Sequence, residues 1–296
     1  MPARERRRSK LRAPAEQQTT PVRRLWLCAD DYGIAPGVNA AIRDLLERRR
    51  LNATSVMVVA PSFSKGEADA LAGLRAAAPT LAIGLHLTLT APFRPLSQGF
   101  APLRAGAFLP LGALLANALA RRLQPERLAA EAAAQLQAFV AALGRPPDFI
   151  DGHQHVQLFP QIREAVLQTS KDAAPNAWLR QCGRALPLVR RFSNRKALLL
   201  DVLSRGFRRR AQALGLRTNP AFAGAYDFDP AGDLSALFAG FLEQLPDNGL
   251  VMCHPGFVDA ELERLDPLTL QREREHAFFA GDAFPAVLAA RGFALA

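Results

Sequence analysis

The sequence predicts an α/β protein that folds as a single β/α barrel, a distorted TIM-like arrangement of about seven strands. Between residues 25 and 296, short apolar runs alternate with longer amphipathic stretches, which is the pattern of repeated β-α units around a parallel sheet. No glycine-rich phosphate-binding loop follows the first apolar run, and this favours a barrel over an open doubly wound sheet. No segment of this range is long and polar enough to act as a linker, so we expect one domain.

The first two β-α units are predicted from residues 25 to 78. Leu25–Ala29 is a short apolar run and predicts the first strand, and Gly37–Arg50 repeats apolar residues at helical spacing. The valine-rich run Ser55–Ala60 predicts the second strand, and Ala68–Ala78 predicts the helix after it. These two units establish the alternation that the rest of the chain continues.

The later elements follow the same alternation with less regular spacing. The predicted strands are Leu81–Leu89, a strand entered at Phe149 and Ile150, Ala177–Leu179, the segment near Ala223–Tyr226, Leu250–Cys253 and Phe293–Ala296. Residues 111–143 are rich in alanine and leucine and predict a helical region that is interrupted near Pro125, because proline cannot continue a helix. Helices are expected in the other gaps.

The cysteine content and the hydropathy exclude a disulfide scaffold, a thiolate zinc site and a membrane-spanning protein. Cys28, Cys182 and Cys253 lie far apart and form no CxxC pair. No apolar stretch approaches the roughly 20 residues that a membrane-spanning helix needs, and the N-terminus lacks the apolar core of a signal peptide. We therefore expect a soluble protein of the reducing cytoplasm.

Much of the excess positive charge lies in the N-terminal segment. The formal net charge is +10, and residues 1–24 carry eight basic and two acidic side chains. Such a segment cannot build a core, so we predict a flexible basic arm at residues 1–24 and the barrel domain at residues 25–296. An aromatic content of 7% and the absence of a binding motif disfavour a specific nucleic-acid-binding protein, which is the alternative that the charge suggests.

A second basic stretch extends from Arg184 to Arg210. Its nine basic residues are interleaved with leucine, valine and phenylalanine, and only Asp201 opposes their charge. Two interpretations stay open. The stretch is either a solvated helix face, or a basic amphipathic surface that contacts an anionic membrane or accepts a phosphorylated or lipid-linked glycan.

Side chains that can ligate metals or transfer protons gather at the ends of the predicted strands. They are an adjacent aspartate pair and four of the five histidines: Asp30, Asp31, His86, His153, His155 and His254. Because the carboxyl ends of barrel strands converge on one face, these side chains are expected to meet there. Each histidine alone is better explained as a hydrogen-bonded structural residue, so the inference depends on the whole set.

The aspartate pair gives this set its chemistry. Adjacent carboxylates at a buried strand end repel each other, and a cation offsets that cost. One aspartate with two histidines leaves open positions for water and substrate, while the second aspartate can act as a general base. The alternative, in which the aspartates only cap the helix that begins near Pro36, suits one of them but not both. Tyr32 and Gly33 continue the loop, and Gly33 permits a conformation that other residues resist.

Four ordered motifs carry a family resemblance. Ala29-Asp30-Asp31-Tyr32-Gly33, Gly84-Leu85-His86, Asp151-Gly152-His153-Gln154-His155 and Cys253-His254-Pro255-Gly256 resemble, in order and spacing, the YdjC-like (ChbG/HpnK) carbohydrate deacetylases. The resemblance covers residues 25–296. It implies a barrel related to polysaccharide deacetylases and a metal-dependent hydrolase that removes acetyl groups from N-acetylated amino sugars.

The resemblance also implies roles for individual residues. Asp31, His86 and His153 would hold one divalent ion, Asp30 would be the general base, and His254 would be an acid or would orient the intermediate. Arg180 matches a basic position that could steady Asp30, and His155 and Tyr32 are the predicted substrate contacts. Family resemblance implies Mg²⁺, whereas two imidazoles and one carboxylate suit Zn²⁺, Mn²⁺ or Co²⁺ better.

The substrate and the partners are less specified. Family members often show a run of three histidines with a further one two positions on, where this chain has His153-Gln154-His155-Val156-Gln157, so its substrate contacts are expected to differ. The substrate is either a chitooligosaccharide-like N-acetylated sugar or a lipid-linked or hopanoid-conjugated one. A barrel that binds sugar without catalysis is disfavoured by the retained site residues. Formation of a homodimer stays open.

Overall fold

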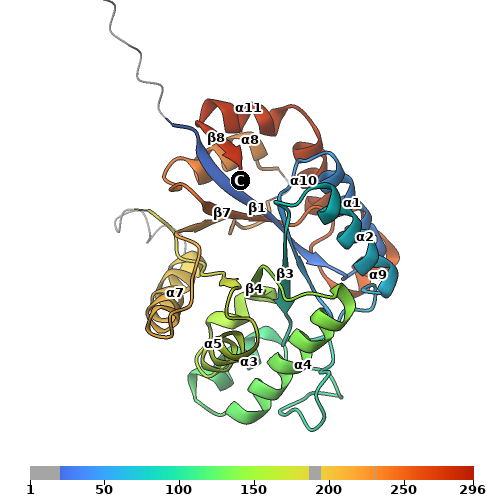
Figure 1. The fold of residues 1–296 in the computed structure, drawn as a ribbon, viewed down its shortest axis with the longest axis vertical. Helices are drawn as coiled ribbons and strands as arrows, with labels where there is room; N and C mark the ends of the chain where they lie inside the picture. The colour runs from blue at the N-terminus through green and yellow to red at the C-terminus, as the bar shows by residue number, and fades with distance from the viewer. Residues whose placement is uncertain (1–20, 187–194, 230) are drawn as a thin grey trace, which may run out of the picture.

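The computed structural model describes residues 21–186, 195–229 and 231–296, so most of the predicted basic arm, together with Arg190 and Arg191 of the second basic stretch, lies outside the described residues. The described chain forms a curled sheet of eight strands with helices on its outer side (Figure 1). Every pairing between these strands is parallel. The predicted β/α barrel is confirmed.

The sheet has the strand order β5-β4-β3-β2-β1-β7-β6, and β8 pairs with the first residues of β1. The strands are β1 (Arg23–Tyr32), β2 (Ala53–Val56), β3 (Ala82–Leu87), β4 (Phe149–Gly152), β5 (Trp178–Leu179), β6 (Phe222–Ala223), β7 (Gly249–Cys253) and β8 (Phe293–Leu295). The outer strands β5 and β6 are not paired directly. The amide of Phe222 donates to the carbonyl of Gly183 at 3.1 Å, and this bond narrows the gap and nearly closes the barrel.

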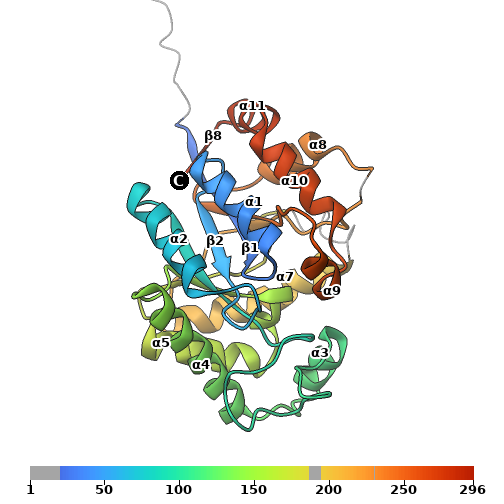
Figure 2. The ribbon, with the colours of Figure 1, turned by 90° about the vertical axis from the view of Figure 1, so that its right-hand side faces the viewer.

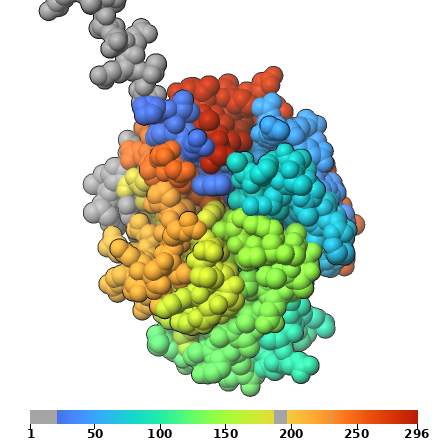
Figure 3. All heavy atoms as spheres, viewed as in Figure 1, coloured from blue at the N-terminus to red at the C-terminus, as the bar shows by residue number. Residues whose placement is uncertain are grey.

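Helices cover the outside of the sheet. They are α1 (Pro36–Glu47), α2 (Lys65–Ala77), α3 (Leu111–Leu119), α4 (Pro125–Leu143), α5 (Ile162–Ala173), α7 (Arg195–Ala213), α8 (Leu234–Leu242), α9 (Ala260–Leu265), α10 (Leu270–Ala280) and α11 (Ala283–Ala290), with the 3₁₀ helix η1 (His153–Leu158). Helices α1, α2 and α10 lie over one side of the sheet (Figure 2). Helices α4, α5 and α7 form a continuous surface on another (Figure 3).

The predicted break at Pro125 is present. Helix α3 ends at Leu119 and α4 begins with Pro125 in its first turn, where a missing backbone N–H costs no helical hydrogen bond. Helix α4 ends before Gly144, whose φ of 68° is the left-handed conformation common after helix ends. Among the described residues, no helix is both long enough and apolar enough to cross a membrane.

Two local predictions near the site are corrected. Asp30 and Asp31 lie inside β1 rather than after it, because the strand continues to Tyr32. The strand predicted at Ser55–Ala60 is wrong after Val56, where β2 ends. The turn that follows is held by Met57, whose amide donates to the carbonyl of Tyr32 at 2.8 Å. His153 and His155, predicted at the end of the strand entered at Phe149, lie in η1, which directly follows β4.

Candidate metal centre

Asp31, His86 and His153 come together at the carboxyl ends of three strands. Asp31 is contributed by β1, His86 by β3, and His153 by the first residue after β4. The Oδ1 atom of Asp31 lies 3.3 Å from His86 Nε2 and 2.9 Å from His153 Nδ1. All three side chains are buried, and their ligand atoms lie within 4.8 Å of one another. This donor set fits one divalent ion with open positions for other ligands.

A bulge in β1 turns Asp31 toward the histidines. The register between β1 and β2 shifts between Ala29 and Tyr32, and Asp31 has a φ of 68°, which non-glycine residues seldom adopt. The carbonyl of Asp31 accepts from the amide of Ile34 at 3.0 Å, which stabilises this turn of the chain. A bulge beside a functional site commonly re-aims a side chain, and the predicted loop is therefore a distorted strand end.

Asp151 supports His86 from the side away from Asp31. His86 Nδ1 lies 2.6 Å from Asp151 Oδ1 and 3.0 Å from Ser55 Oγ. Burial alone would lower the pKa of His86, but the nearby carboxylates, Asp151 foremost, outweigh burial and raise the pKa to about 10. A metal ion would displace the proton at Nε2, whereas Asp151 keeps the proton at Nδ1 and fixes the ring orientation.

Arg180 holds Asp30 in a buried ion pair. Its Nη1 contacts Asp30 Oδ2 at 2.5 Å and its Nη2 contacts Asp30 Oδ1 at 2.7 Å, a geometry that binds both carboxylate oxygens. Burial alone would raise the pKa of Asp30, but Arg180 and then His86 hold it below its usual range. Asp30 is therefore ionised at neutral pH and can accept a proton.

Cys28, Asp30 and Asp151 also lie close enough to suggest a second metal cluster. Arg180 occupies the centre of this group, because its Nη2 also lies 2.7 Å from Asp151 Oδ2 and 2.9 Å from Cys28 Sγ. Burial raises the pKa of the Cys28 thiol well above its usual value, so the sulfur stays protonated. These three residues therefore bind the guanidinium of Arg180 rather than a second metal ion.

His254 completes one wall of the site. It follows β7 and packs edge-on against Phe228, with ring centroids 5.4 Å apart. Its backbone amide donates to Glu275 Oε2 at 2.5 Å, and its Nδ1 is buried without a hydrogen-bond partner among the described residues. His254 also lines the cavity that contains the candidate ligands.

The predicted site residues line one cavity of about 630 Å³, with the exception of Arg180 and Tyr32. The cavity is lined by Asp30, Asp31, His86, His153, Gln154, His155, Phe228, Met252, His254, Asp266, Pro267 and Leu268. Arg180 is fully buried beneath Asp30 and acts on the cavity through it. The base candidate, the three ligand candidates and His254 therefore face the same space.

Of the two predicted substrate contacts, Tyr32 lies away from the cavity and His155 lines it. Tyr32 is the last residue of β1, and its buried hydroxyl contacts Glu67 and Arg43 between α2 and α1, so it packs behind the sheet rather than in the cavity. His155 does line the cavity, and its Nδ1 lies 3.5 Å from Cys182 Sγ. Burial, together with Arg180, lowers the pKa of His155 to about 3, so this ring is a neutral hydrogen-bonding group.

The sequence analysis missed four carboxylates and guanidiniums of the site. They are Asp151, Asp266, Arg272 and Glu275. Asp151 had a signal, because it directly precedes Gly152-His153 in a quoted motif. No sequence feature pointed to Arg272 and Glu275. Helix α10 carries other charged residues beside them, and only the fold shows which of them are buried.

An apolar groove opens beside the metal-site cavity. It has a volume of about 380 Å³ and shares Gln154, His155, Phe228 and Met252 with that cavity. Its remaining wall is mostly aliphatic and comes from α3 and α7, with Leu111, Leu115, Leu199, Leu200 and Leu203 among its residues. The groove therefore offers a dry surface next to the reacting centre.

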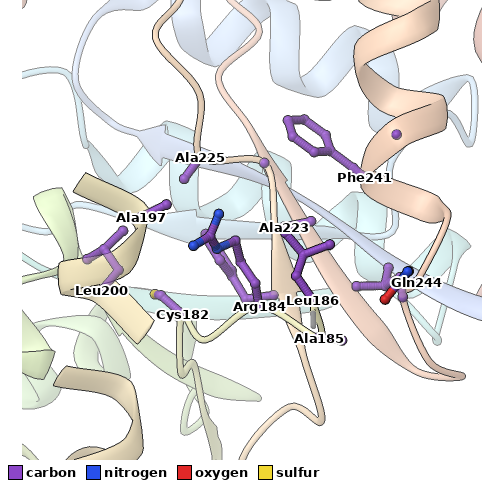
Figure 4. A pocket seen from close by; sticks show the side chains of 14 residues that line it. Cys182, Arg184, Ala185, Leu186, Ala197, Leu200, Ala223, Ala225, Phe241 and Gln244 are labelled. Carbon is purple, nitrogen blue, oxygen red and sulfur yellow. The ribbon is translucent and has the colours of Figure 1, made fainter. Parts of the chain in front are cut away.

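A smaller cavity of about 120 Å³ lies between α7 and α8, next to β6 (Figure 4). Arg184, Leu186 and Phe241 are among the side chains in its wall. Arg184 is ion-paired with Asp201 at 2.8 Å, which also neutralises one charge of the second basic stretch. This cavity contains none of the metal-ligand or base candidates.

The chain is similar to known proteins over most of its length. A chitooligosaccharide deacetylase of Yersinia enterocolitica serotype O:8 is 30% identical over 238 residues, which are 78% of this chain and 81% of that protein. The chitooligosaccharide deacetylase of Escherichia fergusonii is 29% identical over 244 residues, covering 80% and 83%.

One solved structure has the same fold. It is a crystal structure from Enterococcus faecalis V583, described as that of a candidate cellobiose-phosphate cleavage protein, and it superposes with a TM-score of 0.72 at 23% identity, covering 93% of this chain and 97% of that chain. The family model described as YdjC-like protein matches residues 24–290. The chain therefore belongs to the YdjC-like family.

Proposed function

We propose that the protein is a divalent-metal-dependent hydrolase that removes acetyl groups from N-acetylated amino sugars of the chitooligosaccharide kind. The observation that carries this proposal is the convergence of Asp31, His86 and His153 on one cavity wall with the ionised Asp30 beside them. Relatives named chitooligosaccharide deacetylase support the choice of an acetamide as the bond that is cleaved.

In the proposed reaction, water adds to the acetyl carbonyl carbon and the C–N bond breaks to give acetate and the free sugar amine. Asp31, His86 and His153 would hold a divalent ion, which would act as a Lewis acid toward the acetyl carbonyl and would lower the pKa of water. Asp30 accepts the proton of the attacking water, and Arg180 keeps its carboxylate oriented.

His254 is the proposed proton donor to the departing amine. The amine nitrogen is a poor leaving group unless it is protonated, so an acid must donate a proton to it. His254 Nδ1 has no partner among the described residues, and the ring lines the cavity, which supports this role. Glu275 fixes the backbone of His254 and so holds the ring in place.

A second candidate substrate is a lipid-linked or hopanoid-conjugated N-acetyl sugar. The groove beside the cavity supports it, because an apolar aglycone attached to a sugar at the metal site would reach Leu200 and Leu203 through the opening at His155 and Phe228. Helix α7 also exposes Leu199 and Val202, which supports contact of the same face with an anionic membrane.

Acetate release from a panel of substrates tests both candidates. Chelated protein is resupplied with Mg²⁺, Zn²⁺, Mn²⁺ or Co²⁺ and assayed with N-acetylglucosamine oligomers and with N-acetylglucosaminyl lipids. We expect release only after metal is added. Faster release from the oligomers favours the first candidate, and faster release from the glycolipids favours the second. Metal bound without release from either class would contradict the proposed function.

Asp151→Asn is expected to weaken metal binding by about 10- to 100-fold, which is the usual cost of losing the partner of a metal-binding histidine. The change removes the charge that orients His86 at Nδ1 and that also pairs with Arg180. Titration calorimetry with Zn²⁺ measures the effect. An unchanged dissociation constant would show that His86 does not depend on this carboxylate.

A further inference from the structure

Arg272 is a buried guanidinium that contacts the candidate metal ligand Asp31. It lies on α10, has no exposed surface, and its Nη2 contacts Asp31 Oδ2 and Asp266 Oδ2, each at 2.7 Å. Its Nε donates to the carbonyl of Leu268 at 2.9 Å, so the head group is held from two directions. Nη1 is buried without a hydrogen-bond partner among the described residues. Such burial of a charge is costly and needs compensation by a nearby negative group.

The two oxygens of Asp31 therefore face different partners. Oδ1 faces the imidazoles of His86 and His153, and Oδ2 faces Arg272. A carboxylate can bind a metal ion through one oxygen or through both, and the choice changes the coordination number. Because Arg272 engages Oδ2, only Oδ1 is directed at the site where the ion would lie.

We propose that Arg272 is a positioning residue that restricts Asp31 to ligation through one oxygen and weakens the hold of the site on its ion. This inference rests on the metal centre of the proposed deacetylase. A guanidinium repels a divalent cation, and it also draws charge from the shared carboxylate. The ion keeps more of its Lewis acidity and one more open position, both of which serve hydrolysis.

The proposal predicts that loss of Arg272 raises the affinity for the metal ion, whereas loss of an ordinary supporting residue lowers it. Loss of a carboxylate support such as Asp151 weakens metal binding, since a negative charge and an orienting bond disappear. Loss of Arg272 removes a positive charge and frees an additional ligand atom. The same ion should therefore bind more tightly.

Cobalt binding tests the proposal, because the visible spectrum of Co²⁺ reports its coordination number. Wild type, Arg272→Met and Arg272→Lys are titrated with Co²⁺ and followed by calorimetry and absorption. We expect Arg272→Met to bind Co²⁺ at least about tenfold more tightly, with weaker visible absorption for each bound ion as coordination increases. Arg272→Lys should stay within about threefold of wild type because an ammonium keeps the charge.

Arg274→Met is the matched control. Arg274 lies two residues away on α10, and its guanidinium contacts Gln271 and the carbonyls of Asp229 and Gly232 instead of a metal ligand. Its cobalt affinity and spectrum should equal those of wild type. If Arg272→Met does not unfold cooperatively, Arg272→Gln, which is also neutral, takes its place.

Unchanged or weaker cobalt binding with a wild-type spectrum in the neutral variant would overturn the proposal and leave Arg272 as a structural ion-pair partner. Absence of cobalt binding by the wild type would overturn both this role and the metal centre. Cobalt binding that follows the expected order, without acetate release from any sugar, would reject the deacetylase proposal alone. The two proposals can therefore fail separately.

Discussion

Asp30→Asn should bind metal as the wild type does and lose nearly all acetate release. The amide keeps the shape of the carboxylate but cannot accept the proton of the attacking water, and loss of a general base lowers turnover by about 100- to 10,000-fold. Folding should persist, because Arg180 retains its ion pair with Asp151 at 2.7 Å when the charge of Asp30 is removed.

Single-turnover acetate release and titration calorimetry with Zn²⁺ measure the two halves of this prediction. Asp148→Asn is the control, because Asp148 is also paired with arginines, with Arg145 Nη2 at 2.8 Å and Arg75 Nη1 at 2.6 Å, but lies directly before β4 at the opposite end of the sheet. The control should keep turnover. Asp30→Asn protein that retains wild-type turnover would reject the assignment of Asp30 as the base.

The convergence of the candidate site residues was predictable from the sequence because it depends on strand ends. A run of apolar residues predicts a buried β-strand. In a parallel barrel, the residues at the carboxyl ends of the strands then lie on one face. This is why Asp31, His86, His153 and His254 could be placed in one cavity although long stretches of sequence separate them.

The geometry of individual residues was not predictable, because it depends on departures from regular structure. A strand that continues through Asp30 and bulges at Asp31 cannot be distinguished by pattern from a strand that stops at Ala29. Tyr32, a predicted substrate contact, lies instead in the packing between β1, α1 and α2.

The charge balance around the candidate ligands could not be predicted from the sequence either. Arg180 could be proposed through the family resemblance, but Arg272 approaches Asp31 from a helix 241 residues away in sequence. Its neighbours on α10 include the exposed Glu273 and the partly exposed Arg274, and periodicity cannot separate a buried charge from a solvated one. Arg180 pairs with Asp30 and Asp151, and Arg272 pairs with Asp31 and Asp266. Four carboxylates therefore face two guanidiniums, and two negative charges remain for the histidines or an ion to offset.

His86→Ala and His153→Ala should both abolish metal-dependent acetate release. Each variant loses one of three ligands, and we expect metal affinity to fall by more than about 100-fold, because loss of a direct ligand exceeds the cost of losing an outer partner. His276→Ala is the control, since His276 contacts Asp44 at 2.8 Å on the outer helices and should be dispensable for release. Release from either ligand variant at the wild-type rate would remove that histidine from the metal centre.

The two ligand variants should differ in stability even though both lose activity. His86 is tied to Asp151 and Ser55 as well as to Asp31, and its removal leaves a buried carboxylate oxygen without a donor, which costs about 1–3 kcal/mol. His153 has Asp31 as its hydrogen-bonding partner and lies on η1, so its removal strands no second carboxylate. Thermal unfolding of the metal-free proteins should therefore show a lower Tm for His86→Ala than for His153→Ala. Equal Tm values would mean that the contact with Asp151 orients His86 without stabilising the fold. Any stabilisation by Asp151 would then come from its ion pair with Arg180.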